Sequence, residues 1–300
     1  MKDDREVVEL IEKGADANAF SRSGDRLLCV VCENEKVELL KLLIDAGADV
    51  NLYHYDSEYW ETPLQIATKK NNLEMVKMLV EAGADINVIN NKCCLALENA
   101  VKNKNMEMVK FLVEKEAELN DFDEALHKIA LRNNFIYPID RAILNDDFEM
   151  VNFLIDKGGK IKGASLMYAR SKMMILKLLK KGVDVNSRNK KGRTALMEFC
   201  SKSWGYELAK TLIENKADVN LKDNQGETAL IHAICPFGGE RKNIELLLDN
   251  GADVWVKNSK GKDVVELIKI YSDDESIISL LKKKKRNTIF SKTKQRLLGR

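Results

Sequence analysis

Histidine, the side chain that most often acts as an acid, a base or a metal ligand near neutral pH, occurs only three times in this chain of 300 residues. The three histidines, His54, His127 and His232, lie far apart in the sequence. The sequence contains no HExxH motif, phosphate-binding glycine loop, GxSxG motif or paired-carboxylate catalytic motif. We therefore expect no catalytic residue, no metal site and no cofactor, and predict that the protein is not an enzyme.

The cysteines are the second candidates for chemistry. Cys29 and Cys32 form CVVC, which has the spacing of a redox pair, but no βαβ pattern or neighbouring proline surrounds them. Cysteine also packs well as a small hydrophobic residue, and the surroundings favour this second interpretation. Cys93 and Cys94 lack the second pair that a zinc site requires. Six scattered cysteines in a chain of this length indicate a reducing compartment, so we expect a cytoplasmic protein.

Aromatic residues gather in one short stretch of a chain that is only 6% aromatic. Residues 51–60 read NLYHYDSEYW and contain Tyr53, His54, Tyr55, Tyr59 and Trp60. Tyrosine and tryptophan are enriched among the residues that carry binding energy in protein interfaces. The stretch is therefore either a contact surface for a partner or a cluster that packs against a neighbouring turn, depending on the element that holds it.

A repeat with a period near 33 to 35 residues identifies the kind of element that holds this aromatic stretch. The tripeptide Gly-Ala-Asp stands at 14–16, 47–49, 83–85 and 251–253, and weaker copies begin at 116, 158, 182 and 216. A helix-period stretch precedes each copy, as in LEMVKMLVEAG at 73–83, where Gly83 suits a left-handed helix end. A shorter apolar stretch comes earlier in each unit, as in TPLQIA at 62–67 and TALIHA at 228–233, and its threonine can cap a helix. Each unit thus reads turn, helix, turn, helix.

These alternating motifs resemble the ankyrin repeat. DNQGETALIHA at 223–233 matches the turn and first-helix start of that family, and EAGADIN at 81–87 matches its second-helix end. The resemblance implies an all-α solenoid of stacked helix-turn-helix units with short β-turn fingers. About eight or nine units, counting partial ends, would fill residues 1–281, and residues 282–300 form a basic tail that is either flexible or a continuation of the last helix.

The chain departs from the family pattern at several places. The histidine that follows Thr-Pro-Leu in the family is replaced here, so we expect different hydrogen bonding at these helix starts. The residues in its place are Gln65, Asp140, Met167, Met197 and Ile231. The array should be irregular around residues 117–165, where 121–135 is either an extra helix or a slipped repeat. Next to it, ASLMYA at 164–169 predicts a unit with a shortened second helix and almost no finger.

The resemblance also implies a non-enzymatic scaffold or adaptor, monomeric, that binds another protein on the concave face made by its fingers and first helices. Rigid stacking orders that face in advance, so little entropy is lost on docking. The predicted contact residues on the second finger are Tyr53, His54, Tyr55, Tyr59 and Trp60. Those predicted on later fingers are Arg188, Arg193, Lys222 and Asn224.

The basic tail is the basis of an alternative function. Residues 282–300 contain nine Lys or Arg and no Asp or Glu, beginning with Lys282, Lys283, Lys284, Lys285 and Arg286. Such a segment could bind nucleic acid or an anionic membrane, or it could be a solvated end whose first lysines complement the negative end of the last helix. No apolar run or signal sequence indicates a membrane or secreted protein, and delivery into a host cell is a destination that the sequence leaves open.

Overall fold

The computed structural model describes residues 4–20, 25–55, 60–90, 95–120, 136–234, 241–271 and 275–298, with only the backbone at His54, Tyr55 and 287–298. Several predicted features lie outside the described residues: Tyr59, Cys93, Cys94, His127 and the segment 121–135. The chain divides into two compact units, Met1–Lys160 and Ile161–Arg300, which we call the first and the second unit.

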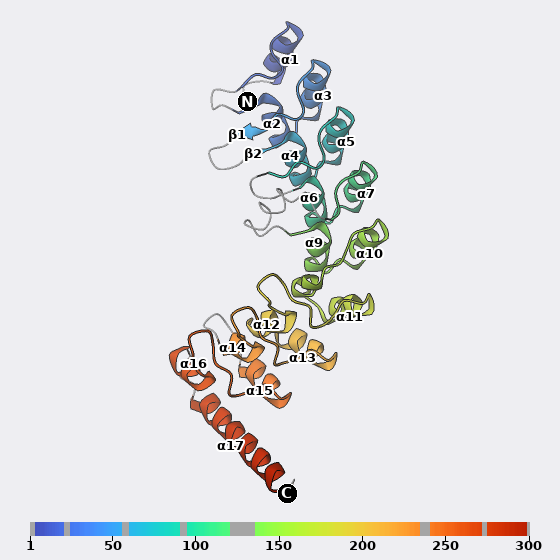
Figure 1. Ribbon diagram of the computed structural model, residues 1–300. Coiled ribbons are helices and arrows are strands. Elements are labelled where there is room, and N and C mark those ends of the chain that lie inside the picture. Colours follow the sequence, from blue (N-terminus) through green and yellow to red (C-terminus); the bar gives the residue numbers. More distant parts are fainter. Residues whose placement is uncertain are drawn as a thin grey trace. The chain divides into compact units, whose positions relative to one another are not determined.

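The first unit consists of two rows of stacked helices (Figure 1). The first helices of successive repeats are α2 (Leu27–Glu33), α4 (Pro63–Lys69), α6 (Ala96–Lys102) and α9 (Pro138–Leu144). The second helices are α1 (Asp4–Glu12), α3 (Val37–Asp45), α5 (Leu73–Glu81), α7 (Met106–Glu114) and α10 (Phe148–Asp156). Within the row of first helices, neighbours pack on one another, as α2, α4, α6 and α9 do in turn. The all-α repeat fold expected from the sequence is confirmed.

The second helices form because their apolar residues recur at three- and four-residue steps. In α5 the side chains of Met75, Val76 and Leu79 are fully buried, whereas Glu74 is exposed. Gly83 then adopts φ +92°, the left-handed conformation predicted for the helix end. Lys216 takes φ +71° at the equivalent position of a later repeat, so the turn persists where glycine has been replaced.

The first helices begin at caps that vary from repeat to repeat, as expected from the missing histidine. Thr62 accepts a hydrogen bond from the Gln65 backbone N–H at 3.2 Å, and the Gln65 side chain donates to the Val88 carbonyl of the next finger at 2.7 Å. The hydroxyl of Thr194 likewise accepts from the Met197 N–H at 3.3 Å. The buried hydroxyl of Thr228 has no hydrogen-bond partner among the described residues, so capping predicted from threonine fails there.

A short hairpin forms the finger between α2/α3 and α4. Strands β1 (His54–Tyr55) and β2 (Trp60–Glu61) pair antiparallel, with His54 opposite Glu61 and Tyr55 opposite Trp60. The aromatic stretch thus belongs to a turn finger, as predicted, and the two ends of the finger are held together by backbone pairing.

The second unit repeats the same plan (Figure 1). Its elements are η1 (Gly163–Tyr168), α11 (Lys172–Lys180), α12 (Ala195–Cys200), α13 (Tyr206–Glu214), α14 (Ala229–Ile234), α15 (Arg241–Asp249), α16 (Val264–Tyr271) and α17 (Glu275–Leu298). First helices η1, α12, α14 and α16 stack in turn, and α17 packs on α16. No described helix of either unit is long and apolar enough to cross a membrane.

The predicted shortening of the second helix near residue 170 is wrong. Helix α11 has nine residues, the same length as α10 and α13, and the irregular element is η1, a six-residue 3-10 helix. A 3-10 helix rises about 2.0 Å per residue against 1.5 Å for an α-helix, so six residues span the distance that a longer α-helix would cover. The Arg170 guanidinium ends η1 by donating to the carbonyls of Met167, Tyr168 and Ala169 at 3.3, 3.2 and 2.9 Å.

Asparagine side chains join consecutive repeats. In each case the side-chain oxygen accepts a backbone N–H of the following repeat at 2.8 Å. The asparagines are Asn18, Asn51, Asn87 and Asn120 in the first unit and Asn186 and Asn220 in the second. We call them the asparagine ladder. The next equivalent position is Trp255, whose side chain has no amide oxygen to accept such a bond.

Candidate functional site

One group of side chains has the composition of a metal site. Among the described residues, Asp223, Glu227 and His232 can bring one ligand atom each within 4.8 Å of one another. Asp223 and Glu227 lie on the finger before α14, and His232 lies on α14 itself. The side chains of Asp223 and His232 are 1% and 6% exposed, so this is an interior arrangement.

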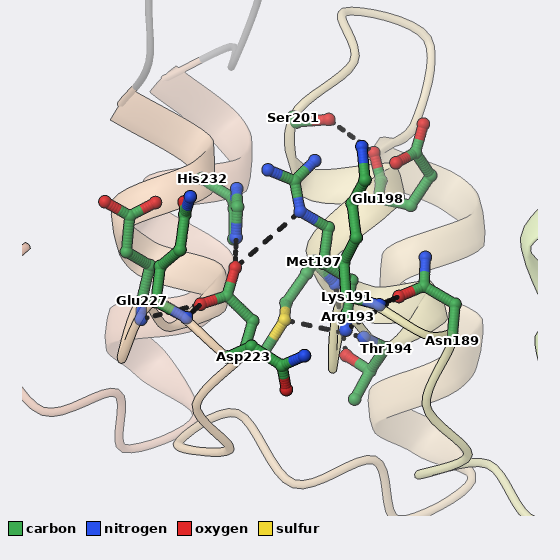
Figure 2. A network of polar contacts seen from close by, with 12 residues as sticks. Asn189, Lys191, Arg193, Thr194, Met197, Glu198, Ser201, Asp223, Glu227 and His232 are labelled. Carbon is green, nitrogen blue, oxygen red and sulfur yellow. Dashed lines mark hydrogen bonds and ion pairs between the residues drawn. The ribbon is translucent and has the colours of Figure 1, made fainter. Parts of the chain in front are cut away.

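The hydrogen bonds of Asp223 decide what this group does. One carboxylate oxygen accepts the backbone N–H groups of Gln225 and Glu227 at 2.9 and 3.0 Å. The other lies 2.9 Å from His232 Nε2 and 3.6 Å from Arg193 Nε, and Figure 2 shows both side chains directed at it. Burial by itself raises the pKa of this carboxyl, but the hydrogen bonds from Glu227, His232 and Gln225 outweigh burial and hold the pKa below its ordinary value.

We interpret this group as a structural anchor. The guanidinium of Arg193 is a permanent positive charge beside the oxygen that a cation would need. Asp223 therefore already has its counter-charge, and its other oxygen is occupied by the turn that follows it. The anchor joins the finger of Asp223 to helix α14 through His232 and to the preceding finger through Arg193.

The cysteines of the described residues are core residues. The side chains of Cys29, Cys32 and Cys200 are fully buried. Burial raises the pKa of the Cys32 thiol far above its ordinary value and that of Cys200 to about 12. A thiol with so high a pKa is not a thiolate near neutral pH and therefore does not act as a nucleophile.

Three fingers of the second unit share one turn geometry. Finger A (188–193), finger B (222–227) and finger C (257–262) each contain an Asn or Asp followed three residues later by Gly. The side-chain oxygen of Asn189, Asp223 or Asn258 accepts the N–H groups two and four residues further on. Gly192, Gly226 and Gly261 adopt φ of +73°, +78° and +76°. The sequence of each finger therefore dictates its own turn.

Fingers A and B are also bonded to each other. Asn224 donates from its backbone N–H to the Lys191 carbonyl at 3.0 Å and from its side chain to the Lys190 carbonyl at 2.9 Å. Arg188 donates to the Lys222 carbonyl at 3.0 Å. With the contact between Arg193 and Asp223, four interactions connect the two fingers, and we call this set the brace.

The brace requires glycine at position 192. A Cβ atom there would lie 2.7 Å from the backbone nitrogen of Asn224 and would also clash with its side-chain oxygen. At Gly226 a Cβ atom would meet nothing within 4 Å. Both glycines have positive φ, which disfavours any other residue. Only at Gly192 would a side chain also clash with the neighbouring finger.

The predicted contact residues fall into two groups in the structure. Arg188, Arg193 and Asn224 all contribute side chains to the brace, whereas the Lys222 side chain is exposed. In the first unit, Tyr53 is 50% exposed and its ring centroid lies 5.1 Å from that of the half-buried Trp60. Partner contact by either group stays a prediction, because neither hydrogen bonding nor exposure identifies a partner.

The first residues of the tail belong to helix α17, and some of them hold the last repeat. Lys285 Nζ lies 3.0 Å from Asp263 Oδ2 and 4.9 Å from the centre of the Trp255 ring. Lys284 Nζ lies 2.9 Å from Asp249 Oδ1. Lys282, Lys283 and Arg286 are exposed. Two of the five cations predicted for electrostatic binding therefore make ion pairs within the chain.

Sequence reasoning missed the anchor and the brace. The signal for the turns was present in NKKGR, DNQGE and NSKGK, where Asn or Asp precedes Gly by three residues. A charge imbalance was also visible, because residues 161–193 contain ten Lys or Arg and one Asp. The contact between Arg193 and Asp223 joins residues 30 positions apart and follows only from the stacking of two repeats.

Comparisons with known proteins agree with the geometry. A family model described as ankyrin repeats matches residues 1–90, 28–123 and 165–258. Ankyrin repeat protein L92 of Acanthamoeba polyphaga mimivirus is 37% identical over 81 residues, which are 27% of this chain and 19% of that protein. Ankyrin repeat and SOCS box protein 6 of Homo sapiens is 33% identical over 100 residues, 32% of this chain and 24% of that protein. The chain thus covers about a fifth to a quarter of these relatives.

The fold has a counterpart among solved structures. The ankyrin repeat domain of Bcl-3 matches 75% of this chain and 98% of its own length, with a TM-score of 0.53 and 22% sequence identity. At that identity the likeness supports the fold alone. Because the family matches extend over more than half of the residues and the helix pairs stack as described, the chain belongs to the ankyrin-repeat family.

Proposed function

We propose that this chain is a non-enzymatic scaffold or adaptor that holds a partner protein on the side formed by its fingers and first helices. Ankyrin repeats are general protein–protein interaction modules, and proteins built from them are generally not enzymes. The buried, protonated thiols and the arginine-paired Asp223 agree with a binding rather than a catalytic role.

The hairpin finger supports this proposal most directly. Tyr53 is half exposed although its ring packs on Trp60, so the pair presents an aromatic surface that is already ordered before a partner arrives. Tyrosine and tryptophan have few rotatable bonds, and ordering them in advance reduces the entropy lost on binding. We propose Tyr53 and Trp60 as the centre of the contact, with His54 and Tyr55 on the adjoining strand β1.

Photo-crosslinking tests the proposal at residue resolution. The photoreactive residue benzoylphenylalanine replaces either Tyr53 or Met173, which is 65% exposed on helix α11 and serves as the control position. We expect a partner protein to be crosslinked from position 53 and not from position 173. In parallel, Tyr53→Ala should weaken capture of the same protein by about tenfold or more, the effect typical of an interface hot spot.

Two results would contradict this assignment. Equal crosslinking from positions 53 and 173 would mean that the hairpin is no more a contact surface than the outer helices. Unchanged capture by a correctly folded Tyr53→Ala variant would assign the ring to stabilising the finger alone. Circular dichroism of the variant provides the folding control.

The basic tail remains the second proposal for function, as a binder of nucleic acid or anionic membrane. The ion pairs of Lys284 with Asp249 and of Lys285 with Asp263 weaken this second proposal, because they occupy two of the tail's positive charges within the chain. Removal of residues 287–300, which spares both ion pairs, should abolish any salt-dependent binding to DNA, RNA or acidic vesicles if the tail is the site. We further propose a monomeric, cytoplasmic protein, which size-exclusion chromatography and localisation of the tagged chain would test.

A further inference from the structure

We propose that fingers A, B and C of the second unit together bind an acidic segment of a partner protein. This inference rests on the proposed role in protein binding and names the chemistry of one partner segment. It concerns a surface separate from the hairpin, which belongs to the first unit.

The three fingers expose a row of positive charge. The exposed lysines are Lys190 and Lys191 on finger A, Lys222 on finger B, and Lys257, Lys260 and Lys262 on finger C. We call these six residues the basic ridge. Charge complementarity therefore calls for an acidic occupant.

The acidic groups of the same fingers do not cancel the ridge. Fingers A and C contain no Asp or Glu, and on finger B the Asp223 carboxylate is buried and paired with Arg193 and His232. Glu227 is half buried. Asp263, which directly follows finger C, pairs with Lys285 of helix α17. The exposed lysines of the three fingers thus outnumber the exposed carboxylates of the same fingers.

The positions of the lysines are fixed by the fold. Each finger is held by its Asx turn, and the brace connects finger A to finger B. Fingers B and C approach each other where Ser259 donates to Glu227 at 3.5 Å. A ligand therefore meets ammonium groups carried on an ordered backbone, and this ordering favours recognition of a particular segment over diffuse attraction.

The composition of the fingers favours a peptide over nucleic acid. Proteins that bind single-stranded nucleic acid stack bases on aromatic side chains. Fingers A, B and C contain no aromatic residue, and the nearby Trp255 has Lys285 over its ring. An acidic peptide needs only carboxylates spaced along an extended chain, which the row of lysines can meet one by one.

The test compares three variants that each remove three positive charges. The ridge variant is Lys191→Ala, Lys222→Ala and Lys260→Ala, with one change on each finger. The outer-helix control is Lys180→Ala, Lys181→Ala and Lys210→Ala, and the tail control is Lys292→Ala, Lys294→Ala and Arg296→Ala. Each full-length protein is titrated against a fluorescein-labelled peptide of repeated Glu-Glu-Asp at low salt, with fluorescence anisotropy as the readout.

We expect the ridge variant to lose about tenfold in affinity and each control less than about twofold, since modest contributions from three ion pairs add up to one decade. Equal losses in all three variants would reduce the effect to net charge and overturn the inference. A loss confined to the tail variant, or no loss in the ridge variant, would also overturn it.

A competition experiment separates the other occupants. If oligo-dT or phosphatidylserine vesicles bound the ridge more tightly than the acidic peptide, the ridge would serve nucleic acid or membrane and the inference would be wrong. Failure of the peptide to bind the unaltered protein would also overturn the inference. It would leave the hairpin test untouched, because crosslinking at Tyr53 reports a partner at a different surface.

Discussion

The finger surfaces of the two units are built on opposite plans. The hairpin of the first unit is held within itself, by strand pairing and by the contact between Tyr53 and Trp60. Fingers A and B of the second unit have their own turns and are also held by each other, through Arg188, Arg193 and Asn224. The length and composition of a finger that is ordered by itself can change without a change in its neighbours. The sequences of two fingers joined by the brace depend on each other.

The units also differ in charge. Residues 1–160 contain 20 Lys and Arg against 31 Asp and Glu, a net charge of −11, and residues 161–300 contain 29 against 16, a net charge of +13. The total of +2 conceals this division. Since the asparagine ladder is the same in both units, the fold can stay constant while the fingers present aromatic residues in one unit and lysines in the other. Scaffold and recognition are thus separable in this chain.

Removing the anchor should produce the largest loss in the braced region. Asp223→Ala leaves the N–H groups of Gln225 and Glu227 without their acceptor and leaves Arg193 and His232 without their counter-charge. We expect the free energy of unfolding to fall by about 3 kcal/mol, measured by urea denaturation. Glu227→Ala, which keeps the carboxylate of Asp223, is the control and should cost less than a third as much. Equal losses would show that the anchor does not hold the fingers.

The anchor should also make stability depend on pH. The pKa of Asp223 is lower in the folded protein than its ordinary value of 3.8, so the ionised form is the one that folding favours. This stabilisation is present above the unfolded-state pKa and is lost as the pH falls through the lower folded-state pKa. Asp223→Asn cannot ionise, so the stability difference between the two proteins should shrink as the solution is acidified below about pH 4. A constant difference would contradict the prediction.

Glycine 192 offers a test of the brace with a matched control. Gly192→Ala and Gly226→Ala both place a side chain on a residue with positive φ, which costs about 1 kcal/mol. Only Gly192→Ala also drives a Cβ atom against Asn224. We expect a total loss of about 2–3 kcal/mol at position 192 and about 1 kcal/mol at position 226, measured by urea denaturation. Indistinguishable losses would mean that fingers A and B do not support each other.

The contrast between a finger ordered by itself and fingers that contact each other also explains which features could be predicted from the sequence. The helix pairs, their left-handed ends and the finger containing Trp60 follow from patterns within about ten residues of one another, and they were predicted correctly except in the repeat that contains η1. The contacts of Arg193 and Asn224 were not predicted, because they join side chains about one repeat apart, and their geometry depends on how repeats stack. The irregularity of this repeat was assigned to the second helix instead of η1, since apolar spacing over six residues does not separate a 3-10 from an α-helix.

The asparagine ladder should behave alike in the two units, which sharpens the contrast between their fingers. Asn51 accepts from Asp85 at 2.8 Å and donates to Gly83 at 3.1 Å, and Asn220 accepts from Asp253 at 2.8 Å and donates to Gly251 at 3.0 Å. Because both side chains are exposed, Asn51→Ala and Asn220→Ala should each cost about 1 kcal/mol in urea denaturation. A difference of more than about 1 kcal/mol would show that the units also differ in how their repeats are joined.

The smallest expected effect separates the structural from the solvated lysines of the tail. Lys285, only 15% exposed, contacts Asp263 and Trp255, so Lys285→Ala should cost about 1 kcal/mol. Lys283 is exposed, and Lys283→Ala removes the same charge as a control that should leave the melting temperature nearly unchanged. Equal melting temperatures of the two variants would mean that Lys285 does not stabilise the last repeat. Lys285 would then count among the cations available to bind a partner. If they differ as expected, the last repeat requires Lys285, and the exposed cations of the tail are the ones that remain available for binding.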